Sequence, residues 1–77
     1  MRNFNDVQRK LISEDPYLAR AMETVGAAMA YRDRKGLTQN EFAALAQIPS
    51  IVYKKIEEGK KVPSLETLSK IARTAGL

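Results

Sequence analysis

The stretch from Leu37 to Gly59 constrains the fold most, because it carries the sequence pattern of two short helices joined by a tight turn. Thr38 stands three residues before Glu41, and at this spacing a hydroxyl and a carboxylate can each accept a hydrogen bond from the other residue's backbone N–H in a capping box. We therefore predict a helix that begins near Gln39. Phe42, Leu45 and Ala46 follow at helical spacing and are expected to form its apolar face, while the small Ala43 and Ala44 let a second helix approach closely.

The second helix is predicted from about Pro49 to Glu58. Proline suits the first turn of a helix, and Gly59 can adopt the left-handed conformation that ends one. Tyr53 and Ile56 are three positions apart and are predicted to point inward. The outer surface of this helix is then left to Ser50, Ile51, Lys54, Lys55 and Glu58.

These residues resemble the lambda-repressor-like helix-turn-helix domains of the Cro/C1 or XRE type. The matching elements lie between roughly Ala30 and Leu77; they are Arg32, Gly36-Leu37-Thr38-Gln39, Glu41, Ala43, Ile56-Glu57, Gly59-Lys60 and Pro63-Ser64-Leu65-Glu66-Thr67-Leu68. The resemblance implies an all-α bundle of about five helices, here with an extra N-terminal helix. It also implies that the second helix of the pair lies in the DNA major groove, and that Arg32 and Glu57 form a structural salt bridge.

Two positions depart from the family pattern. Gln47 stands in the turn where the family usually carries glycine, so a positive φ at this position would have a steric cost. Ile51 stands where relatives usually carry polar or small residues. Because it is expected to face outward, it could contact a thymine methyl group or a protein, and the sequence leaves both alternatives open.

The chain before Leu37 is predicted to form two helices. Residues 1–14 are assigned to an N-terminal arm, in which residues 5–13 form a short amphipathic helix that packs on the core or binds a partner. Residues 15–77 form the DNA-binding domain, and Asp15-Pro16 starts its first, long helix. The buried stripe of this helix is predicted to contain Leu18, Met22, Val25 and Met29, with Gly26 at a close approach to another helix and Gly36 at the end.

The last helix is predicted to begin after Ser64, whose hydroxyl can cap it. Its apolar face is expected to hold Leu65, Leu68, Ile71, Ala72 and Ala75. Gly76 is predicted to end this helix, with the apolar Leu77 folding back onto it.

The composition argues against catalysis. A chain of 77 residues can bury only a small core, and it contains no cysteine and no histidine, so the usual metal ligands and general base are missing. We therefore expect no enzyme activity, no metal and no cofactor. The absence of cysteine, of a long apolar run and of a signal-peptide pattern leads us to expect a cytoplasmic protein without a membrane segment.

The charge distribution favours a polyanionic partner. The formal net charge is +4, and four lysines fall near the end of the second helix of the pair. Placed on the docking mode that the resemblance implies, eight residues are predicted to contact double-stranded DNA: Thr38, Gln39, Ser50, Ile51, Lys54, Lys55, Lys60 and Lys61.

The predicted function is sequence-specific transcriptional regulation, by a repressor that binds its operator as a homodimer. The alternative is an antitoxin that binds a toxin protein and represses its own operon, because residues 4–16 resemble the N-terminal extension of HigA-type antitoxins. In a third hypothesis DNA binding has been lost and Ile51 marks a protein-binding surface.

Overall fold

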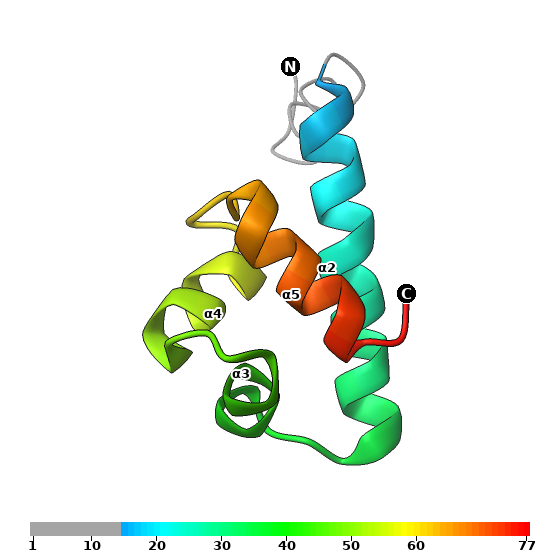
Figure 1. Ribbon diagram of the computed structural model, residues 1–77, viewed down its shortest axis with the longest axis vertical. Coiled ribbons are helices and arrows are strands. Elements are labelled where there is room, and N and C mark those ends of the chain that lie inside the picture. The colour runs from blue at the N-terminus through cyan, green and yellow to red at the C-terminus, as the bar shows by residue number, and fades with distance from the viewer. Residues whose placement is uncertain (1–14) are drawn as a thin grey trace, which may run out of the picture.

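The computed structural model describes residues 15–77, which form four α-helices and no strand (Figure 1). The helices are α2 (Pro16–Lys35), α3 (Gln39–Ala46), α4 (Ser50–Glu57) and α5 (Leu65–Thr74). The predicted all-α fold is confirmed. The predicted N-terminal arm, residues 1–14, lies outside the described residues, as does the helix expected within it.

The longest helix, α2, supports the other three. Figure 1 shows α5 lying across α2, with α3 and α4 to one side of that pair. The helix α3 packs against both α4 and α5, and α4 also contacts α2. Each of the two short helices is therefore fixed against more than one neighbour.

Capping residues set the starts of three helices. Asp15, Thr38 and Ser64 each accept a hydrogen bond from the backbone N–H three residues further on, at 3.1, 3.0 and 3.2 Å. The carboxylate of Glu41 accepts a return hydrogen bond from the Thr38 N–H at 2.9 Å, so the predicted capping box is present. By contrast, α4 begins without a side-chain cap, and Pro49 stands just before its first turn rather than within it.

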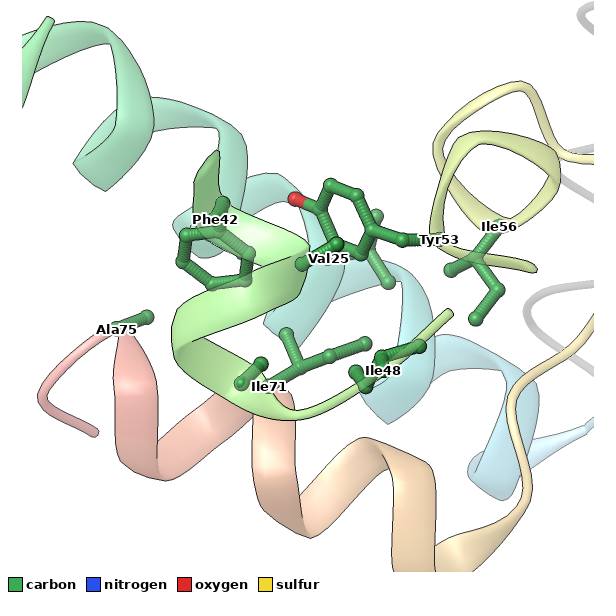
Figure 2. Packing of buried hydrophobic residues seen from close by; sticks show 10 residues of the cluster. Val25, Phe42, Ile48, Tyr53, Ile56, Ile71 and Ala75 are labelled. Atoms are coloured by element: carbon green, nitrogen blue, oxygen red, sulfur yellow. The ribbon is translucent and has the colours of Figure 1, made fainter. Parts of the chain in front are cut away.

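The core lies where the four helices meet. Its largest fully buried side chains are Tyr53, Phe42 and Ile71, from α4, α3 and α5 respectively. Figure 2 shows these side chains converging with Val25 of α2 on one space. The rings of Phe42 and Tyr53 lie 5.0 Å apart between centroids, within the range at which aromatic pairs attract each other. The two short helices are thus joined through one aromatic contact.

The predicted buried stripe of α2 is wrong at its methionines. Met22 and Met29 are 42% and 41% exposed, whereas Ala21, Val25 and Ala28 are buried. Both sets have helical spacing and share Val25, but they differ by a rotation of the helix. Alanines let neighbouring helices approach closely, so the tightly packed face of α2 is the alanine face and not the more hydrophobic one.

Three leucines predicted to be buried are exposed, namely Leu45, Leu65 and Leu77. A spacing of three residues leaves two side chains about 60° apart around the helix axis, so Leu45 and Leu65 lie beyond one edge of the face that buries Phe42 and Ala46 in α3 and Leu68 and Ile71 in α5. At the C-terminus, Gly76 has φ +79° and the Leu77 N–H donates to the Ala72 carbonyl at 2.9 Å. The predicted cap therefore forms, but its leucine side chain does not fold back.

Gly26 does not mark a close approach, contrary to the prediction. It is exposed, and a Cβ atom placed on it would meet no heavy atom within 4 Å. The glycine therefore gives α2 no packing advantage, and relative to alanine it costs the helix about 1 kcal/mol.

The turn between α3 and α4 has the predicted strain. Gln47 adopts φ +59° and ψ +46°, and it is the only non-glycine residue with positive φ in the part of the chain that the structure describes. The N–H groups of Gln47 and Ile48 donate to carbonyls at the end of α3, and Ile48 is buried. The left-handed residue thus satisfies the helix end and directs Ile48 into the core, at a steric cost.

Replacing Gln47 with glycine is expected to raise the free energy of unfolding by roughly 0.5–1 kcal/mol. Relief of a left-handed conformation is worth about 1–2 kcal/mol, which exceeds the extra backbone entropy that glycine loses on folding. Urea unfolding measures the change. The matched control is Ala44→Gly at an exposed site within α3, which should lower stability by about 1 kcal/mol. Destabilisation by Q47G would contradict the assignment of strain.

Candidate nucleic-acid interface

The outer face of α4 carries the side chains predicted to meet DNA bases. Ile51 is 68% exposed and Lys55 is exposed, while Ser50 and Lys54 are half-buried at the edges of this face. The opposite face holds the buried Tyr53 and Ile56. An α-helix with its side chains is about 10–12 Å in diameter, which matches the roughly 12 Å width of the major groove. We call Ser50, Ile51, Lys54 and Lys55 the α4 face.

The loop that follows α4 adds positive charge beside this face. Lys60 and Lys61 are both exposed. Lys60 forms an ion pair with Glu58 at 3.3 Å, but both side chains are at least half-exposed, and exposed pairs contribute little to stability. The N–H of Lys60 donates to the Lys55 carbonyl at 2.9 Å, which fixes the start of the loop against the end of α4.

The first turn of α3 brings Thr38 and Gln39 to the interface in different roles. The Thr38 hydroxyl accepts a hydrogen bond from the Glu41 N–H and so belongs to the helix cap. Gln39 is half-buried, and its side-chain nitrogen donates to a carboxylate oxygen of Glu57 at 2.9 Å. A primary amide has two N–H donors, so the second is left for an external acceptor.

The ion pair expected between Arg32 and Glu57 is present. The guanidinium of Arg32 donates from Nε and Nη2 to the two oxygens of Glu57 at 3.1 and 3.0 Å, which is the bidentate geometry. Its Nη1 donates to the carbonyl of Leu37 at 3.1 Å. The Glu57 side chain is only 4% exposed and that of Arg32 is 22% exposed, so solvent screens this pair far less than a surface pair.

The surroundings of this pair keep both groups charged. Burial alone would raise the pKa of Glu57, but the polar groups of Tyr53, Gln39 and Arg32 around it outweigh burial, and the pKa is lowered. The pKa of Arg32 is raised, mainly by its hydrogen bonds to Glu57. The arginine of α2, the glutamine of α3 and the glutamate of α4 therefore form one charged network, which we call the Arg32–Gln39–Glu57 network.

Tyr53 has a role at this network that the sequence pattern did not indicate. Its hydroxyl oxygen is fully buried and makes no hydrogen bond of acceptable geometry within the described residues. Burial raises the pKa of this phenol, and the nearby Glu57 carboxylate raises it further. The helical spacing identified Tyr53 as a core residue, whereas its polar tip lies beside the ion pair.

A model of the helix-turn-helix family matches residues 29–77, from the later turns of α2 to the end of the chain. The chain belongs to the helix-turn-helix family. It is of the Cro/C1 type, also called XRE-like, and is a DNA-binding transcriptional regulator of that type. Comparisons with curated proteins and with solved structures gave no significant match. No helix from residue 15 onward is long and apolar enough to cross a membrane.

In this helix-turn-helix protein, Arg32→Ala is expected to lower the free energy of unfolding by about 3 kcal/mol. This is near the low end for breaking a buried ion pair, because Arg32 remains partly exposed. The loss follows from stranding the buried Glu57 carboxylate, so the double variant R32A/E57Q should be more stable than R32A. Chemical unfolding of the wild type, R32A, E57Q and R32A/E57Q measures the coupling energy between the two side chains. If R32A/E57Q lost the sum of the two single effects, the network would not be cooperative.

The pH dependence gives an independent check on the same network. Since the folded-state pKa of Glu57 is lowered, its carboxylate contributes stability that is present above its ordinary value of 4.5 and is lost as the pH falls through the lower folded-state value. The acid-induced loss of stability should therefore be smaller in E57Q than in the wild type over this range.

Proposed function

We propose that this regulator is a repressor that occupies an operator with α4 in the major groove. The observation that carries the proposal is the α4 face, where Ile51 and Lys55 project from a short helix whose other side is held by the core. Lys60 and Lys61 lie in the loop directly after α4, and Gln39 of the first turn of α3 donates a hydrogen bond to Glu57 at the end of α4. This combination provides groups for base edges at the centre and groups for phosphates on both sides.

The α4 face and its surroundings suggest a division of roles. Gln39, Lys60 and Lys61 would bind phosphates, and Thr38 would fix the α3 N-terminus whose amides support them. Lys55 is the strongest candidate for a contact with guanine O6 and N7, since it is fully on the outward side. Ile51 would contact a thymine methyl group, while the half-buried Ser50 and Lys54 would contact the groove from the edges of the helix.

We further propose that the repressor binds as a homodimer. A single α4 helix reads only a few base pairs, and two copies could read half-sites about 34 Å apart. The proposed action is binding alone, without catalysis, metal or cofactor, on double-stranded DNA in the cytoplasm. In support, the most buried carboxylate of the interface, Glu57, is committed to Arg32 and Gln39.

The antitoxin alternative stays a prediction. Its basis is the resemblance in residues 4–16, most of which lie outside the described residues. No contact in the described part of the chain favours a toxin partner over plain repression, and the two roles are compatible. The third hypothesis is that DNA binding has been lost and that Ile51 marks a protein-binding surface. Lys54 and Lys55 on the same helix argue against it, because positive side chains suit the DNA backbone.

The repressor proposal predicts tighter binding to a labelled duplex from the protein's own upstream region than to a scrambled duplex. Fluorescence anisotropy at several salt concentrations measures both affinities. Lys55→Ala should reduce the discrimination between the duplexes, by about 1–3 kcal/mol if the guanine contact is bidentate. Weak and equal binding that disappears with salt would contradict sequence-specific repression.

The same titration tests the phosphate contacts. Lys60→Ala combined with Lys61→Ala should reduce the slope of log K against log salt by about 1 to 2. The charge-matched control is R20A/R73A, which removes two exposed arginines from α2 and α5. It should leave the slope nearly unchanged, and an equal change in both double variants would mean that only net charge matters.

A further inference from the structure

The loop between α4 and α5 is tied to the far end of α2 by one hydrogen bond. The hydroxyl of Tyr17, in the first turn of α2, donates to the carbonyl of Pro63 at 2.7 Å, and the contact is partly buried. The two residues are 46 positions apart in the sequence. The bond therefore joins the start of the long helix to the loop that carries Lys60 and Lys61.

This hydrogen bond holds a part of the loop that has little other polar support. The Lys60 N–H donates to Lys55, and the Ser64 carbonyl accepts from the first turn of α5. Among the described residues, the bond from Tyr17 is the only hydrogen bond to the backbone between these two points. Lys61 and Val62 are exposed, and their backbone N–H groups have no acceptor within the described part of the chain.

We propose that Tyr17 is a positioning residue for DNA binding. By fixing the Pro63 carbonyl, its hydroxyl holds the backbone of Lys61 in one orientation, so that the lysine side chain is preorganised for a phosphate. A loop that is already ordered loses less conformational entropy on binding than a mobile one. This inference rests on the proposed function, because it assumes that the loop contacts the DNA backbone.

The structure separates this role from simple packing. Pro63 is itself buried, so the proline ring anchors the loop whether or not the hydroxyl is present. Removing only the hydroxyl therefore leaves the fold and the loop path in place, and changes how tightly that path is fixed. The effect belongs to the loop alone, since Tyr17 stands on α2 and outside the α4 face.

The test combines Tyr17→Phe with the K60A/K61A variant in a double-mutant cycle. The full-length proteins are titrated with the upstream duplex at several salt concentrations. Y17F should weaken DNA binding about threefold to fivefold, which corresponds to the net worth of one hydrogen bond, and should make the salt dependence less steep. In the K60A/K61A background, Y17F should change the affinity less than about 1.5-fold, because the contacts that it positions are gone.

Tyr31→Phe is the matched control, because it also removes one phenol hydroxyl from α2, and that hydroxyl makes no hydrogen bond in the described residues. It should leave both affinity and salt slope unchanged. An equal effect of Y17F in both backgrounds, or no effect in either, would overturn the positioning role. If K60A/K61A itself left the salt slope unchanged, the loop contact in the proposed function would fail first, and the role of Tyr17 with it.

Discussion

The bidentate ion pair between Arg32 and Glu57 is the interaction on which the DNA-binding arrangement depends. Its carboxylate also accepts from Gln39, so one buried charge connects the scaffold helix α2 with both helices of the helix-turn-helix pair. A buried charge is costly unless all of its hydrogen-bond partners are in place. The network therefore favours a single orientation of α3 relative to α4. The hydrophobic core supplies most of the stabilisation, whereas the network supplies the orientation of α4 on which base reading depends.

The same network explains why one side of α4 packs in the core while the opposite side is exposed to solvent. Tyr53 and Ile56 bury the inner side against the core, and Glu57 is held at the boundary by Arg32. Ile51 and Lys55 on the outer side are exposed and do not pack in the core, so they are available to bind a partner. The strained turn at Gln47 also helps to place α4. Its left-handed conformation turns the chain sharply, so that α4 can start a few residues after α3 ends.

Helix ends could be predicted from the sequence because capping is a local effect. The hydroxyl of Thr38 and that of Ser64 reach N–H groups three residues away, so the residue type and spacing suffice. The direction of the buried face could not be predicted in the same way. Met22 and Ala21 are neighbours with equally good spacing, and the choice between them depends on how closely other helices approach α2. The positions of Ile51 and Lys55 on the surface were predictable from helical geometry, whereas the bond from Tyr17 to Pro63 left no local pattern.

The central claim, that α4 and its following loop form the DNA-binding surface, is tested most directly by NMR. Amide chemical shifts of the labelled protein are followed while the upstream duplex is added. The account predicts that the largest shifts map to Ile51, Lys55 and Lys61, with small shifts along the exposed side of α5. Large shifts confined to α5, with the amides of α4 unchanged, would contradict it.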